Sequence, residues 1–427
     1  MSSHEDAAVR AITKSVLQDI EEIATLSKPG KGVTRLAYSA EDMRARDWFK
    51  GRCEEIGLGF GMDAVGNCFA STPSGSSKGA LLMGSHLDSV VEGGRFDGVL
   101  GVVLALALAR HFAHQKTAMP MIVASFACEE STRFGFGSIG SRFFVGELTP
   151  PQFPSLVDSE GRSLPEVLSV AEVAPSGDDV KLPKPSGIHA YLEVHIDQGA
   201  MLTSIPVRLG IVTNIAGVQR IAIRWIGEAA HSGARARAQR RDALIAASEF
   251  IVSLNRLWRE MDPDGDRLAV TVGRLTVHPN SPNTVPGEVD LVVDLRADHI
   301  ATMRLAYQRL REIADGVAAT ARCGLEWREL GIVEPTPMSP DVIALLEAES
   351  ARGGAHSTRC VSLTGHDAIP VGRVIPAGMV LLANPSGVSH TADESVDPLA
   401  LAECVKLLLR AIPALVAEPV TSRGATA

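Results

Sequence analysis

The sequence has no hydrophobic run long enough to cross a membrane. Its longest apolar stretch, residues 99–109, falls short of the roughly 20 residues that a transmembrane helix needs. The first residues, MSSHEDAAVR, are polar and acidic, so we expect no signal peptide. The six cysteines are scattered without a CxxC pair, and a chain of this size needs no disulfides. We therefore expect a cytoplasmic protein that does not bind a membrane.

Basic runs are also missing. A net charge of -9 and the absence of any cluster of Lys and Arg exclude the usual surface for nucleic acid. An anionic substrate stays possible, because a cleft sets its own local field. With 427 residues, 45% of them hydrophobic, the chain exceeds what one core covers, and we expect two domains.

Metal-ligating side chains follow a first apolar strand. Residues 80–83 (ALLM) are typical of a buried strand and 99–112 of a buried helix, and the Gly-rich loop between them carries His86, Asp88 and Asp97. His86 offers an imidazole, and Asp88 can accept the hydrogen on the other ring nitrogen. Asp97 can give one oxygen to each of two cations. The alternative is an ordinary polar loop with a capping aspartate.

Similar side chains follow other apolar runs. Residues 121–128 (MIVASFAC) lead directly into Glu129 and Glu130, whose side chains point in different directions. One can bind metal while the other faces the attacking water, although a pair of solvated acids at a helix start is also common. His195 lies in an alternating strand, and His390 follows another apolar run. Since ligands gather at the carboxyl ends of strands in open α/β sheets, these residues predict a metal site.

Seven segments, in order, resemble the M20-type metallohydrolases, in the carbamoylase (hydantoinase/carbamoylase amidase) branch. That branch includes N-carbamoyl-L-amino-acid hydrolases, β-ureidopropionase, and allantoate and ureidoglycolate amidohydrolases. The segments are GSHLDSVVEGGRFDGVLGV, EESTRFGFGSIGS, YLEVHIDQG, AAHSG with RRDAL behind it, NTVPGEVDLVVDLR, TGHDA and VSHTADE. They run from about Gly84 to Glu394 and cover most of the chain. The resemblance implies hydrolysis of a C–N bond in an N-carbamoyl (ureido) amino acid or a similar small amide that bears a carboxylate.

The resemblance also implies a binuclear metal centre. Its ligands would be His86 and His195 on one ion, Glu130 and His390 on the other, and Asp97 as the bridge. Glu129 would be the general base, and Asp88 the carboxylate behind His86. Two divalent ions polarise the scissile carbonyl and lower the pKa of water. Zinc, manganese, cobalt and nickel all suit these ligands.

Five further residues match substrate-binding positions of the family. His231 would stabilise the oxyanion, often from the partner subunit of a homodimer. Asn283 and Arg296 match a pair that holds the substrate carboxylate, for which the guanidinium fork is suited. Gln198 and His366 would line the pocket and orient the ureido group. A surface histidine at 231 and a solvated arginine at 296 are the ordinary alternatives.

One loop departs from the family pattern. Where carbamoylases carry HAGTTPM, this chain has HSGARAR, from His231 to Arg237. Arg235 and Arg237 would meet a differently placed anionic group of the substrate, or else pair with acids at a dimer interface or face solvent. The sequence therefore indicates the class of reaction more clearly than it indicates the substrate.

The order of periodic segments predicts an α/β fold with an insertion. Residues 1–213 and 334–427 are expected to form a doubly wound, mixed-sheet metallohydrolase domain. Residues 214–333 show a βαββαβ order, which is typical of a ferredoxin-like α+β layer and would be the lid and dimerisation domain. Hinges near 213–217 and 331–336 would let the domains close on substrate.

Two other functions stay open on the same fold. A dipeptidase, an aminoacylase or a hydrolytic amine-releasing enzyme would need a differently shaped pocket. A catalytically inactive binding protein is expected to lose a ligand or the base, and here all of those residues are present.

Overall fold

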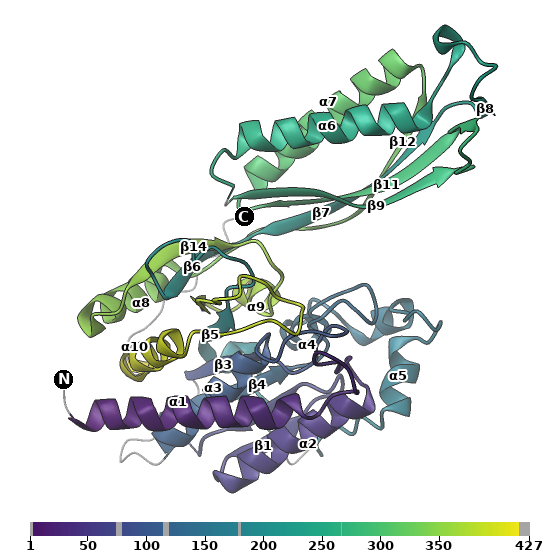
Figure 1. The fold of residues 1–427 in the computed structure, drawn as a ribbon. Coiled ribbons are helices and arrows are strands. Elements are labelled where there is room, and N and C mark those ends of the chain that lie inside the picture. Colours follow the sequence, from purple (N-terminus) through teal and green to yellow (C-terminus); the bar gives the residue numbers. More distant parts are fainter. Residues whose placement is uncertain (1–2, 74–78, 114–118, 178–180, 266, 418–427) are drawn as a thin grey trace. The chain divides into compact units, whose positions relative to one another are not determined.

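The computed structural model describes residues 3–73, 79–113, 119–177, 181–265 and 267–417. The chain forms two compact units (Figure 1). The first comprises Met1–Thr213, Pro337–Cys360 and Gly365–Ala427, and the second Asn214–Thr336 and Val361–Thr364. Within the described ranges, no helix has the length and apolar character needed to cross a membrane.

The first unit is built on a nine-stranded mixed sheet. Its path is β1-β2-β4-β3-β5-β15-β6-β13, and β14 also pairs with β6. The central strands β4, β3, β5 and β15 are parallel, whereas β1, β2 and β6 run antiparallel to their neighbours. The strands are β1 (Gly59–Met62), β2 (Cys68–Ser71), β3 (Ala80–His86), β4 (Met121–Phe126), β5 (Ile188–Ile196), β6 (Leu209–Ile215), β13 (Thr336–Pro337), β14 (Ser357–Ser362) and β15 (Ala377–Leu382).

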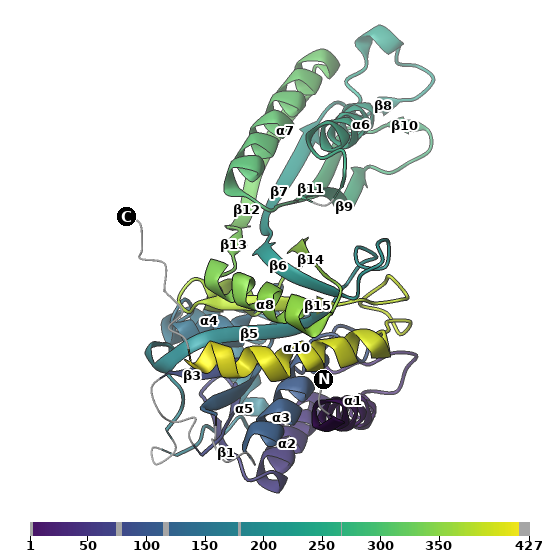
Figure 2. The same ribbon diagram turned by 90° about the vertical axis from the view of Figure 1, so that its left-hand side faces the viewer.

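Helices cover both faces of this sheet because side chains alternate along each strand. A side chain on Gly378 of β15 would meet Val342 of α8 and Leu192 of β5, so Leu192 faces α8. The next residue, Glu193, points the other way and accepts the backbone N–H of Ala368 in α9 at 2.8 Å. Helices α8 and α10 lie side by side over β15 (Figure 2). The helices are α1 (Ser3–Ala24), α2 (Ala40–Glu55), α3 (Val99–Ala113), α4 (Ile139–Val145), η1 (Pro150–Ser155), α5 (Leu164–Val170), η2 (Pro185–Gly187), α8 (Pro340–Gly353), α9 (Ala368–Gly372) and α10 (Pro398–Ala417).

The second unit is a four-stranded antiparallel sheet, β12-β7-β11-β9, packed against α6 and α7. Alternate residues of β7 are buried in the unit's own core, where the rings of Trp225 and Phe250 make a tilted contact with their centroids 5.7 Å apart. The βαββαβ order confirms the predicted ferredoxin-like insertion in an α/β fold. The elements are β7 (Gly217–Ile226), β8 (Ala230–His231), η3 (Arg237–Gln239), α6 (Ala243–Met261), β9 (Leu268–His278), β10 (Thr284–Val285), β11 (Glu288–Ala297), α7 (Ile300–Ala321) and β12 (Gly324–Val333).

Close packing of α3 on the central sheet yields a stability prediction. A Cβ on Gly101 would lie 2.5 Å from the carbonyl oxygen of Val194 in β5. We expect Gly101→Ala to lower the thermal midpoint, because overpacking costs about 1–3 kcal/mol and outweighs the roughly 1 kcal/mol that alanine gains over glycine in a helix. Gly316 in α7 is the matched control, since a Cβ there would meet no atom within 4 Å and Gly316→Ala should raise the midpoint. A raised midpoint in Gly101→Ala would show that α3 is free to shift.

Candidate metal centre

His86 and His195 lie at the same level of two neighbouring parallel strands. In the pairing of β3 with β5, Met83 is opposite Leu192, so His86 and His195 come side by side three residues later. Both side chains are buried, and their ring centroids are 6.2 Å apart. Parallel pairing therefore places two imidazoles at the carboxyl edge of the sheet, where open α/β folds bind ligands.

A backbone carbonyl fixes the orientation of each ring. Nδ1 of His86 lies 2.9 Å from the carbonyl oxygen of Asp88, and Nδ1 of His195 lies 3.1 Å from that of Ile196. Because a carbonyl only accepts, Nδ1 carries the hydrogen in both rings. Nε2 of each ring therefore faces the site, where it can bind a metal ion once it carries no hydrogen.

The carboxylate of Asp88 differs from the sequence prediction. Its Oδ1 is 3.7 Å from Nδ1 of His86, beyond hydrogen-bonding distance. Its two oxygens instead accept the backbone N–H groups of Glu129 (3.2 Å) and Glu130 (3.1 Å). These donors follow the end of β4 and need acceptors, whereas the Asp88 carbonyl already satisfies the histidine ring. Burial raises the pKa of Asp88 to about 7. The Asp88 carboxylate therefore fixes the backbone of the two glutamates.

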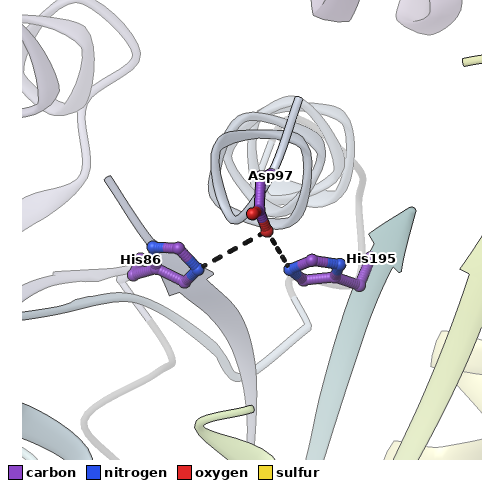
Figure 3. A group of neighbouring side chains, drawn as sticks. All are labelled: His86, Asp97 and His195. Atoms are coloured by element: carbon purple, nitrogen blue, oxygen red, sulfur yellow. Dashed lines mark ion pairs between the residues drawn. The ribbon is translucent and has the colours of Figure 1, made fainter. Parts of the chain in front are cut away.

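The carboxylate of Asp97 faces two groups of ligands. Oδ1 is 2.9 Å from Nε2 of His195 and 4.0 Å from Nε2 of His86, so the two rings flank it (Figure 3). Oδ2 is 3.1 Å from Nε2 of His390. Burial alone would raise the pKa of Asp97, but the hydrogen bonds with His195 and His390 hold it well below the usual value. An ionised carboxylate in this position is suited to bridge two cations.

The adjacent glutamates face different parts of the site. Cys128 turns the chain just before them with a positive φ of 54°, which is rare outside glycine. Oε1 of Glu130 lies 3.3 Å from Nε2 of His390, whereas Oε2 of Glu129 lies 3.8 Å from Nε2 of His86. Burial and the charges of neighbouring carboxylates raise the pKa of Glu129 well above its usual value.

The donor atoms fit divalent metal ions. Each of two sets of three side chains has its donor atoms within 4.8 Å of one another; the sets are His86, Asp97 and His195, and Asp97, Glu130 and His390. Imidazole nitrogens and carboxylate oxygens suit zinc and other first-row divalent ions. Gln198 donates to both oxygens of Asp97 at 3.1 and 3.2 Å. Its buried Oε1 has no hydrogen-bond partner among the described residues.

Comparison with known proteins agrees with this geometry. The pattern of peptidase family M20/M25/M40 matches residues 82–414. The chain belongs to this family. It is 32% identical to the N-carbamoyl-L-amino-acid amidohydrolase of Paenarthrobacter aurescens, covering 95% of this chain and 98% of the relative. It is 30% identical to the allantoate amidohydrolase of Bacillus subtilis, covering 90% and 93%. A crystal structure of a hydantoinase/carbamoylase family amidase from Burkholderia multivorans is 30% identical, with a TM-score of 0.85 over 96% of this chain and 98% of that one.

These findings confirm the resemblance to the carbamoylase branch of the M20 family. His366, which the sequence predicts to line the pocket, lies beside the candidate metal ligands of this M20 chain, with its ring in an edge-on contact with His195 at 4.7 Å between centroids. Burial lowers the pKa of His366 well below its usual value, so the ring is neutral near pH 7. Gln198 and His366 therefore both contact candidate metal ligands, Asp97 and His195 respectively.

Glu193 was not among the site residues predicted from the sequence. Its buried carboxylate accepts the hydroxyls of Ser85 (2.8 Å) and Tyr191 (3.0 Å), and the backbone N–H of Ala368. It thereby ties β3 and α9 to β5 beside the metal ligands. The signal was a charged residue inside an apolar strand, on the same face as His195.

The inserted unit of the M20 chain holds the other predicted site residues. His231 lies beside Asn283, because Thr284 is opposite His231 and the N–H of Ser232 donates to the Asn283 carbonyl at 2.9 Å. Arg296 lies at the far end of β11, eight residues beyond Glu288. This separation is about 27 Å along an extended strand. Within one copy, Asn283 and Arg296 therefore do not form the carboxylate-holding pair predicted from the sequence.

The arginines of the altered loop differ in their surroundings. Arg235 pairs with Glu228 of its own unit at 3.0 Å, and Arg240 donates to the carbonyls of Ser232 and Arg235. Arg237 is exposed. Arg235 is thus held by contacts within its own unit. For Arg237, the predicted contacts with a substrate anion, with acids at a dimer interface or with solvent all stay predictions.

A third set of possible ligands in the inserted unit contains its own cation. His278, Glu288 and Asp290 lie close together, but Arg224 contacts Asp290 at 2.8 Å and Glu288 at 3.7 Å. The guanidinium already pairs with both carboxylates, so we assign no metal there.

The close packing of Gly98 against the His86 ring yields a prediction on metal binding. A Cβ on Gly98 would lie 2.4 Å from the His86 ring. We expect Gly98→Ala to displace the ring and weaken Zn²⁺ or Mn²⁺ binding at least about tenfold, as loss of ligand orientation does. Calorimetric titration of the metal-free protein measures this. Gly354→Ala is the control, because Gly354 also has a positive φ but nothing within 4 Å of where its Cβ would lie. Equal affinity in both variants would show that the ring moves without cost.

Proposed function

We propose that this M20 protein is a metal-dependent amidohydrolase that cleaves the C–N bond of an N-carbamoyl amino acid or a similar small amide bearing a carboxylate. The observation that carries the proposal is the Asp97 carboxylate, whose two oxygens face separate sets of histidine and carboxylate ligands. We propose two divalent ions there, zinc or else manganese, cobalt or nickel. The names of the relatives, N-carbamoyl-L-amino-acid amidohydrolase and allantoate amidohydrolase, support the substrate class.

The chemistry assigned to the protein follows from the positions of its side chains. When bound, the metal ions supply polarisation of the scissile carbonyl and lower the pKa of water. Glu129 lies beside the ligand set, so its carboxylate is placed to take a proton from water and to deliver it to the leaving nitrogen. Asp88 keeps Glu129 and Glu130 in place through their backbone N–H groups. Gln198 and His366 orient the ureido group.

We also propose that the protein works as a homodimer. His231 and Asn283 lie together at one end of the inserted unit, and Arg296 lies at the other. One small substrate cannot span about 27 Å of strand, so a single copy does not supply both ends of the inserted unit to one substrate. Two copies related by a two-fold axis can each supply one end to a shared site. His231 would then stabilise the oxyanion, and Asn283 or Arg296 the carboxylate.

We place the enzyme in a reducing cytoplasm. All six cysteines are free, and five of them are buried. Free buried thiols are typical of proteins in compartments where disulfides do not form.

Ammonia release tests the proposed reaction and its base. The metal-reconstituted protein is assayed for ammonia on N-carbamoyl-L-amino acids, allantoate and ureidoglycolate, and for free amino acids on dipeptides. We expect ammonia from at least one ureido acid. Glu129→Gln keeps the shape but cannot transfer the proton, so turnover should fall at least about 100-fold with metal content unchanged. Hydrolysis of dipeptides alone would refute the ureido substrate class. Full turnover in Glu129→Gln would remove Glu129 from the base role.

Mixing two inactive variants tests the shared site. Glu129→Gln and His231→Ala chains are each expected to be inactive as homodimers. If His231 acts on the partner's metal centre, a mixed dimer has one intact site, and a random mixture regains about a quarter of wild-type activity. Different affinity tags on the two variants, and capture of mixed dimers through one tag, control for exchange of subunits. No recovery after proven exchange would show that each chain uses its own His231.

A further inference from the structure

Glu394 holds the loop that carries the bridging ligand. Its Oε1 accepts the backbone N–H groups of both Phe96 and Asp97 at 2.9 Å. The side chain is buried, with 4% of its surface exposed, although it lies almost 300 residues from its partners along the chain. Hydrogen bonds from N–H groups to a carboxylate are among the stronger ones in proteins. The backbone position of Asp97 is therefore set by a residue from the far end of the sequence.

The position of these N–H groups explains why an acid is needed. Phe96 and Asp97 lie three and two residues before the first residue of α3, Val99, and the first turn of α3 contains no acidic residue. Their N–H groups have no partner inside the helix, and the helix dipole favours a negative charge near this end. Glu394 supplies that charge from another segment. Gly94 leaves room for it, since a Cβ there would lie 2.1 Å from the Glu394 carboxylate carbon.

The other oxygen of Glu394 contacts the segment that carries His390. Oε2 accepts the hydroxyl of Ser389 at 2.7 Å. The next residue, His390, has a positive φ of 58°, a conformation that needs support from its surroundings. Its Nε2 lies 3.1 Å from Oδ2 of Asp97. One carboxylate thus joins the backbone of the bridging ligand to the neighbour of a second ligand.

We infer that Glu394 is a positioning residue that sets the spacing between Asp97 and His390, and so controls whether the second metal ion is bound. This inference rests on the proposed binuclear centre. Glu394 donates no atom to either ligand set, and it acts through Asp97 and Ser389. Partners that orient ligands in this way typically change metal affinity by about 10–100-fold when they are removed.

Manganese titration of the metal-free protein tests the inference. Calorimetry counts the Mn²⁺ ions per chain and their affinities, and electron paramagnetic resonance detects a spin-coupled pair. Wild type should bind two ions and give the coupled signal. Glu394→Ala should bind the second ion about 10–100-fold more weakly and lose the coupled signal at the same Mn²⁺ concentration. Glu394→Gln keeps an acceptor oxygen for the two N–H groups, so it should restore most of the affinity.

Two further variants separate positioning from a general loss of stability. Ser389→Ala removes the hydroxyl that donates to Oε2 of Glu394 at 2.7 Å and lies 3.5 Å from Oδ2 of Asp97, but it leaves the two backbone N–H contacts of Glu394, so it should give an intermediate effect. Glu349→Gln removes another buried carboxylate, 7% exposed in α8, and should bind Mn²⁺ as wild type does. Equal affinities in wild type and Glu394→Ala would overturn the inference, as would equal weakening in Glu394→Ala and Glu349→Gln. A wild-type protein that binds a single ion would overturn the binuclear centre itself.

Discussion

Mutual repulsion among buried carboxylates is the constraint on which this site depends. Acids that crowd the carboxyl edge of the parallel strands must either share cations or be stabilised by the protein. Asp88 and Glu394 each accept two backbone N–H groups, which stabilise an anion without adding a competing positive charge. Asp97 and Glu130 turn instead toward histidine nitrogens. Asp97 and Glu130 are therefore available to metal ions, whereas Asp88 and Glu394 hold the backbone of the loops that carry the ligands.

Much of this arrangement was predictable because it follows from strand geometry. Apolar runs such as 80–83 and 121–126 mark buried parallel strands, and parallel strands end at one edge. Side chains that follow those runs must therefore meet, whatever their separation in sequence. The βαββαβ order of the insertion was likewise readable, because its strands alternate and its helices have apolar faces.

Other features depend on which atom of a residue faces a neighbour, and residue type does not determine that. Asp88 matched the expected position behind His86, yet its carbonyl contacts the ring and its carboxylate goes elsewhere. Asn283 and Arg296 are close in sequence, but an extended strand separates them to opposite ends of one unit. Glu394 was within a recognised segment, VSHTADE, but its partners at 96 and 97 are set by tertiary packing alone.

The inserted unit has its own hydrophobic core, and this independence bears on how substrate preference can change. Trp225, Phe250 and their neighbours stabilise the second unit without using any residue of the metal edge. Mutations far apart with no shared partners act nearly independently. The loop from 231 to 237 is held locally, by Arg235 on Glu228 and by Arg240 on nearby carbonyls. Its sequence can therefore depart from the family pattern while the ligand geometry at Asp97 is kept.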